Sequence, residues 1–125
     1  MGITGESLFR DFKSFTSADT VGTYYQITNA GGGQGRSVTT FNIINNDTID
    51  HNLDVVLETY DGASWVVAES RTFKILAGDS ILATEFLVPL LPRVDTNHDR
   101  IRTKINEAVG SGKNVQVFIA GAQFV

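Results

Sequence analysis

The feature that most constrains this chain is a period-two alternation of apolar and polar residues in short runs separated by turn-forming residues. Asn52–Tyr60 reads NLDVVLETY and places Leu53, Val55 and Leu57 on one face, and Arg100–Ile105 (RIRTKI) alternates in the same way. Successive side chains of a β-strand point to opposite faces, so this pattern predicts strands with one face in a core.

Strand-like runs of this kind follow one another at spacings of about 8–12 residues, which is typical of a sandwich or barrel rather than of βαβ units. For Arg100–Ile105 a helix through Ala108 is the alternative, but the period of two favours a strand. We therefore predict an all-β, antiparallel β-sandwich, Ig-like or jelly-roll-like, with roughly seven to nine strands in a single domain, residues 21–125. The predicted strands are Thr23–Ile27, Ser37–Ile44, Asn52–Tyr60, Trp65–Glu69, Arg71–Leu76, Ser80–Leu87, Arg100–Ile105 and Val115–Val125.

The core is predicted from the apolar faces of these strands. Truncation of Leu57 to alanine is expected to cost about 2–5 kcal/mol if it lies in that core. The predicted core residues are Leu53, Val55, Leu57, Phe73, Ile75, Ile101, Ile105, Val115, Val117 and Ile119.

The first 20 residues have a different pattern. Leu8, Phe9, Phe12 and Phe15 have helix-like spacing, but the segment is short and ends in the polar run TSADT. Three interpretations stay open for residues 1–20: a short helix, an edge strand, or an arm that orders only on a partner.

Composition excludes several classes of protein. The 125 residues contain no cysteine, which removes disulfides, cysteine-based metal sites and thiol nucleophiles. The net charge of −4 argues against a protein that coats nucleic acid. No apolar run has the roughly 18–20 residues of a membrane span, and the N-terminal residues lack the apolar region of a secretory signal. We expect no membrane and no nucleic-acid partner.

The sequence gives little support for catalysis. The two histidines, His51 and His98, both lie beside turn-forming Asn and Asp residues and are interpreted as solvated. No G-x-S-x-G nucleophile motif is present, and the glycine-rich segments Gly31–Ser37 and Gly110–Asn114 both fail the phosphate-loop patterns. The chain is therefore predicted not to be an enzyme.

One loop offers oxygen ligands for a metal. Asp95, Asn97 and Asp99 alternate as in the first half of a calcium loop. However, Arg100 stands where that loop needs glycine, and Asn106 stands where it needs a bidentate glutamate. An Asx-rich turn is the favoured interpretation, and calcium is the one candidate cofactor.

Charge is distributed unevenly along the chain. Residues 1–92 hold 5 basic and 11 acidic groups (−6), whereas residues 93–125 hold 5 and 3 (+2). Five acids between Asp47 and Asp61 are expected to point outward, as a solvated face or as a docking patch for a basic partner. Arg100, Arg102 and Lys104 form the basic counterpart, and such asymmetry permits contacts between subunits.

Several segments together resemble small β-sandwich virion proteins of tailed bacteriophages. They are YYQITN…GRSVTTFNIINNDTIDHNLDVVLETYDG, the turn ILAGDSI (Ile75–Ile81) and the terminal DRIRTKINEAVGSGKNVQVFIAGAQF (Asp99–Phe124). The resemblance covers about Tyr24 to Val125. The chain departs from it in the proline-broken Leu87–Asp99 segment and in the aromatic N-terminal stretch.

This resemblance implies a non-enzymatic structural protein, made in the host cytoplasm and located in the virion. The leading expectation is a capsid decoration or cement protein whose partners include the major capsid protein. One alternative is a neck or tail-completion subunit. The alternative from a different class is a carbohydrate-binding sandwich with Trp65 and Tyr60 as its sugar platform, although a core position for Trp65 is favoured.

The last predicted strand suggests self-association. Val117 and Ile119 share one face while Phe118 is on the other, and a strand that is apolar on both faces is usually covered on both. We predict a homo-oligomer, with a trimer favoured because the resembling decoration proteins often occupy threefold positions; packing of Phe118 within the domain is the alternative. The predicted interface residues are Phe118, Phe124, Arg100, Arg102, Lys104, Phe9 and Phe12, with Phe15 in the same N-terminal segment.

Overall fold

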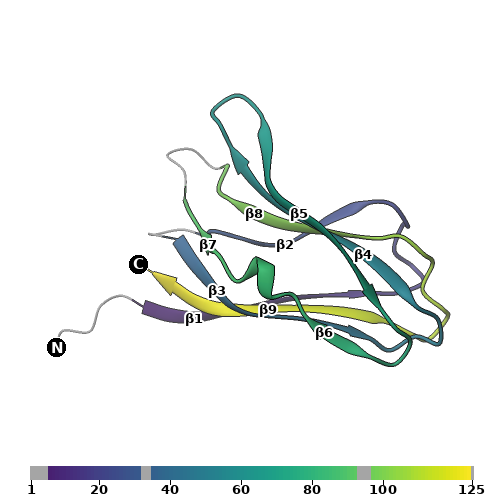
Figure 1. Cartoon of the computed structure of the whole chain (residues 1–125). Helices are drawn as coiled ribbons and strands as arrows, with labels where there is room; N and C mark the ends of the chain where they lie inside the picture. The colour runs from purple at the N-terminus through teal and green to yellow at the C-terminus, as the bar shows by residue number, and fades with distance from the viewer. Residues whose placement is uncertain (1–5, 32–34, 93–96, 125) are drawn as a thin grey trace.

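The chain folds into two antiparallel β-sheets that pack face to face (Figure 1). The structure, a computed structural model, describes residues 6–31, 35–92 and 97–124. Its elements are β1 (Glu6–Phe15), β2 (Tyr24–Asn29), β3 (Gly35–Asn45), β4 (His51–Tyr60), β5 (Trp65–Ile75), β6 (Ser80–Leu82), the 3₁₀ turn η1 (Thr84–Phe86), β7 (Pro89–Leu90), β8 (Arg100–Ile105) and β9 (Val115–Phe124).

The strand order identifies the sandwich as a jelly roll. Sheet A has the order β1-β9-β3-β6, with the short β7 also pairing with β3, and sheet B has the order β2-β8-β4-β5. The pairs β1–β9, β2–β8, β3–β6 and β4–β5 are those of one long hairpin rolled into two sheets. The prediction of a single-domain antiparallel sandwich is confirmed, in its jelly-roll form.

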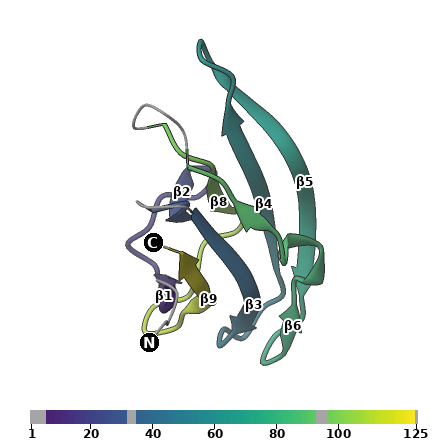
Figure 2. The same cartoon turned by 90° about the vertical axis from the view of Figure 1, so that its left-hand side faces the viewer.

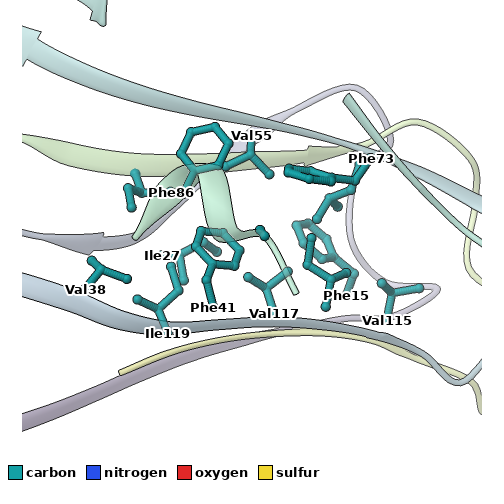
Figure 3. Close-up of a cluster of buried hydrophobic side chains, with 14 of the residues drawn as sticks. Phe15, Ile27, Val38, Phe41, Val55, Phe73, Phe86, Val115, Val117 and Ile119 are labelled. Atoms are coloured by element: carbon teal, nitrogen blue, oxygen red, sulfur yellow. The ribbon is translucent and has the colours of Figure 1, made fainter. Parts of the chain in front are cut away.

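The core fills the space between the sheets and is built largely from aromatic rings. Phe86 packs against Phe41 and Phe73, with ring centroids 5.9 and 6.1 Å apart, and Phe15 meets Tyr25 edge-on. Figure 3 shows these phenylalanines between the two sheets with Val117, Ile119 and their neighbours. Burying a side chain of this size contributes roughly 1.5–3 kcal/mol, so this layer holds the sheets together.

Nine of the ten predicted core residues are buried. The exception is Leu57, which is half-buried and packs against the edge of the core. The end of the β4–β5 hairpin extends beyond sheet A (Figures 1 and 2), whose strand on that side, β6, has only three residues. Leu57 therefore lacks a full layer of partners opposite it.

Two of the predicted strand assignments differ from the structure by more than a shift of one or two residues at an end. The runs predicted as separate strands, Trp65–Glu69 and Arg71–Leu76, form one strand, β5, with a bulge where the register shifts opposite Leu57 and Glu58. The strand predicted over Ser80–Leu87 stops at Leu82, because the chain turns inward through η1. That turn places Phe86 in the core, and burial of this ring replaces further strand pairing along β3.

The N-terminal segment forms an edge strand, one of the three interpretations left open for residues 1–20. β1 pairs with β9 without interruption from Glu6 to Phe15 and belongs to the same sandwich as the rest of the chain. The helix-like spacing of its phenylalanines has another cause. Phe9 and Phe15 are buried on the inner face, while Phe12 lies on the outer face and is exposed.

Candidate assembly surfaces

The outer face of sheet A exposes large apolar side chains in a setting of mostly uncharged residues, among the side chains that the structure describes. Residues directly opposite one another in neighbouring strands share a face, so the register places Phe12, Phe118, Asn42 and Leu82 in one row across four strands. We call this the ridge row. Phe12 and Leu82 are 69 % and 67 % exposed at its two ends. These exposed apolar side chains make the outer face of sheet A the candidate assembly surface.

A second row lies beside the first. Arg10, Ala120 and Thr40 are opposite one another in β1, β9 and β3, and we call them the groove row. Ala120 and Arg10 line a hollow of about 360 Å³, together with Leu8, Phe9, Thr39 and Gly121. Thr40 lines a second hollow of about 160 Å³ on the far side of Thr39, with Phe41, Asn42, Leu82, Thr84 and Leu87.

A small side chain in the groove row and a close approach of two backbones beside it explain this depression. Ala120 offers a single methyl group, and at Gly121 an added Cβ would overlap the main-chain oxygen of Ser37. The backbones of β3 and β9 approach closely there, where the register shifts between Val38 and Thr40. Among the described side chains in these rows, Arg10 is the one charged group, and its guanidinium carbon lies 5.9 Å from the ring centroid of Phe118.

The outer face of sheet B has the opposite character, because it carries charges that pair within the chain. Glu58 accepts hydrogen bonds from Arg100 Nε (2.9 Å), Arg102 Nε (2.6 Å) and Arg102 Nη2 (3.0 Å). Lys104 Nζ lies 3.2 Å from Asp54 Oδ2. The basic side chains and the acids of β4 therefore satisfy each other across the β4–β8 pair.

Burial and these arginines act in opposite directions on Glu58. Desolvation is the largest single effect, and it raises the pKa of Glu58. The hydrogen bonds from Arg102 and Arg100 and the positive charges of these arginines lower it, and together they outweigh desolvation, so the pKa of Glu58 is lowered overall. The predicted exposed acidic face is wrong for this residue, which is buried. The reason is that β8 lies beside β4 and lays its arginines over the carboxylate.

The aromatic pair proposed as a sugar platform is covered by a cation. The guanidinium carbon of Arg100 lies 3.6 Å from the ring centroid of Trp65, and Tyr60 meets that ring edge-on at 5.3 Å. The half-buried Trp65 lies at the base of the hairpin turn and not in the central core. One of its ring faces is already occupied by Arg100, so the structure gives the sugar-binding alternative no added support.

A buried polar cluster closes one end of the sandwich. His51 Nε2 lies 2.8 Å from Asp47 Oδ2, and its Nδ1 lies 3.3 Å from Glu107 Oε1, outside hydrogen-bond alignment. Asp47 also accepts hydrogen bonds from the main-chain N–H groups of Thr48 and Gly110. The hydrogen bond to His51, followed by these two, lowers the pKa of Asp47 to about 2.

This cluster corrects two predictions. His51 is fully buried, not solvated, and Asp47 is buried, not exposed. His51 is the first residue of β4 and points inward by the alternation of that strand, so the turn residues before it fold over the ring. The cluster joins the β3–β4 and β8–β9 loops. Its enclosure leaves a substrate no access to the imidazole.

The predicted calcium loop is described only in part. Asp95 lies outside the described residues. Asp99 is buried, and its Oδ2 accepts a hydrogen bond from the main-chain N–H of Leu91 at 3.0 Å. This carboxylate thus tethers β7 to the start of β8. Among the described residues, no group of three or more acidic, histidine or cysteine side chains could hold a metal ion.

The predicted interface residues separate into three environments. Phe12, Phe118 and Phe124 lie on the outer face of sheet A. Phe9 is buried, with the Arg36 guanidinium carbon 4.6 Å from its ring centroid. The basic residues of β8 pair with acids of their own chain, as described above. An interface role for any of these residues stays a prediction.

Sequence reasoning missed the remaining polar contacts between strands. Arg36 of β3 reaches Asp11 of β1, Thr28 of β2 and Gln123 of β9. Its position just before the predicted strand Ser37–Ile44 gave no signal, because its partners lie in strands that only the fold brings together. Within residues 6–31, 35–92 and 97–124, no helix is long and apolar enough to cross a membrane.

Comparison with known proteins shows the fold and no family. Neither the protein-family models nor the curated proteins contain a match. Among solved structures, the chain is similar to one from the disulfide-linked pili of Bacillus endospore appendages, with a TM-score of 0.54 and 12 % identity over 99 % of this chain and 92 % of that chain. A crystal structure of PirA aligns over 92 % of this chain and 82 % of the PirA chain with 17 % identity. Its TM-score of 0.35 is too low to indicate a shared fold.

Proposed function

We propose that this chain is a non-enzymatic structural subunit that assembles with further copies of itself through the outer face of sheet A. The observation that carries this proposal is the ridge row, whose ends, Phe12 and Leu82, are 69 % and 67 % exposed, and whose described side chains carry no charge. Exposed apolar patches of this kind mark contact sites in proteins. The other broad face, on sheet B, pairs its charges internally and needs no partner.

The shared fold with a pilus protein is consistent with a structural role, although the likeness is one of fold. That neighbour is described as disulfide-linked. This chain has no cysteine, so in our proposal its copies associate by apolar contact and hydrogen bonds alone. The strength of such an assembly then depends on concentration, because no covalent bond fixes it.

Sedimentation of the full chain tests self-assembly. We expect a mass larger than the monomer at micromolar concentration, reduced to the monomer by Phe12→Lys. The control is Val67→Lys, which places the same charge at an exposed position of β5 in sheet B and should leave assembly unchanged. A monomer at all concentrations up to hundreds of micromolar would refute the proposal.

Within this structural role, the finer proposal is decoration of a tailed-phage capsid, with a neck or tail-completion subunit as the alternative. It rests on the strand-and-turn segments that resemble virion proteins, above all NNDTIDHNLDVVLETYDG and ILAGDSI. Mass spectrometry of purified particles tests it by copy number. A number matching the capsid symmetry supports decoration, six or twelve copies supports the neck or tail, and absence from particles refutes both.

A further inference from the structure

We infer that two copies of this chain pack the outer faces of sheet A together about a twofold axis that lies between the ridge row and the groove row, so that each row faces the other row of the partner. This inference rests on the proposed self-assembly and names its geometry. It predicts a twofold contact where the sequence favoured a trimer.

The rows are complementary in shape. The ridge row carries two phenylalanines, Phe12 and Phe118, in β1 and β9, and the groove row carries Arg10 and Ala120 in the same two strands. The rows are two residues apart along each strand. A twofold axis parallel to the rows and midway between them exchanges the two, so Phe118 of each copy faces Ala120 of the partner copy. The hollow of about 360 Å³ beside Ala120 leaves room for the ring.

The polar residues of the two rows fit the same arrangement. Asn42 belongs to the ridge row, and Thr40, in the same strand, belongs to the groove row. The twofold exchange places the partner's Thr40 over Asn42, so an uncharged polar side chain meets another that can hydrogen-bond with it, and the reciprocal contact forms at the same time.

The low charge of the two rows also suits a second copy of the chain better than a strongly charged partner. Arg10 is the one charged side chain among the described members of these rows, and the exchange places it against Phe12 of the other copy. An arginine over an aromatic ring is a favourable contact, because the cation is attracted to the negative face of the ring. An acidic partner would find one cation on this face, whereas a second copy presents a surface of matching polarity.

A size swap between the facing positions tests the geometry. Ala120→Phe makes the face more apolar but fills the hollow, so we expect the dimer dissociation constant to rise at least tenfold. Phe118→Ala removes the ring that fills the partner's hollow and should weaken association by a similar factor. The double variant Phe118→Ala/Ala120→Phe exchanges ridge and groove on both copies and should restore affinity to within about threefold of the unchanged protein.

Controls separate the geometry from general stickiness and from misfolding. Thr40→Val should weaken association several-fold, because it removes the hydroxyl that faces Asn42 of the partner copy. Val67→Phe, on sheet B, should leave it unchanged. Circular dichroism should stay the same and thermal unfolding should stay cooperative, since all substituted side chains lie on the outer faces of the sheets.

The outcomes also distinguish this inference from the proposed function. Tighter association of Ala120→Phe, or no rescue in the double variant, would overturn the twofold geometry while leaving self-assembly intact. A trimeric mass for the unchanged protein would do the same. A protein that never associates would overturn both.

Discussion

The buried carboxylate of Glu58 offers a sharp test of how sheet B is held together, through the substitution Glu58→Gln. Glutamine has nearly the same shape and keeps one acceptor oxygen, so the change removes the charge and leaves the packing. In the unchanged protein, Glu58 receives three hydrogen bonds from Arg100 and Arg102. The variant retains two cationic donors that face a neutral amide.

The size of the effect follows from burial. The Glu58 side chain is 7 % exposed, whereas those of Arg100 and Arg102 are 19 % and 28 % exposed. Exposed ion pairs contribute about 0–1 kcal/mol, and breaking a fully buried pair costs about 3–5 kcal/mol. Because water can partly solvate the two arginines again, we expect an intermediate loss of about 2 kcal/mol. For 125 residues with an unfolding entropy of about 2.1 cal/mol/K each, this lowers the melting temperature by about 8 °C.

Thermal melts at pH 7 and low salt measure this loss, with Asp54→Asn as the matched control. Asp54 lies 3.2 Å from Lys104 in the same strand pair, but its side chain is 21 % exposed. We expect the control to lose no more than about 1 kcal/mol, or about 4 °C. Equal losses in the two variants, or a loss below about 2 °C for Glu58→Gln, would refute burial as the cause.

Three further predictions concern the core, the polar cluster and the β3–β9 contact. Leu53→Ala, at a fully buried site, should cost about 3–5 kcal/mol in chemical denaturation, and Leu57→Ala about 1–2 kcal/mol, because Leu57 is half-buried. The pKa of Asp47 is lowered to about 2, chiefly by the hydrogen bond to His51, so the stability that this carboxylate supplies is present above about pH 4 and lost as the pH falls towards 2. Melting temperatures of Asp47→Asn should therefore fall less steeply between pH 4 and pH 2 than those of the unchanged protein. Gly121→Ala should cost more than about 2 kcal/mol, since its Cβ would overlap a main-chain oxygen of β3, and a loss below about 0.5 kcal/mol would show that the strands separate easily there.

The strands were predictable because each buries one face. Burial of one face requires apolar and polar residues to alternate along the strand, and this alternation can be seen in the local sequence. Arg100–Ile105 shows this most clearly, since every second side chain is buried from Ile101 to Ile105. The same reasoning failed where a strand continues beyond its covering layer. Leu57 has the right period for a core residue, but the short β6 leaves its side uncovered, and no local signal reports the length of a strand in the other sheet.

The candidate sites were less predictable because they depend on contacts between distant segments. From the sequence alone, His51 resembles a solvated turn residue. In the folded chain Glu107, from the loop after β8, lies beside it, and the sequence around His51 does not indicate this contact. The acids of β4 and the bases of β8 were both recognised as charged stripes. Their pairing with each other, however, requires that β4 and β8 be neighbours, which is a property of the jelly-roll order and not of either stripe.

The contrast between the two outer faces explains why assembly is assigned to one of them. On sheet B, an acid such as Glu58 or Asp54 has its cation in the next strand, so covering this face with a partner would desolvate satisfied charges without new bonds in return. On sheet A, the ridge row exposes hydrocarbon at Phe12 and Leu82. Covering that face removes apolar area from water without burying paired charges, so it favours association. A lone copy is therefore less well satisfied on sheet A than on sheet B, and this difference drives the association that we propose.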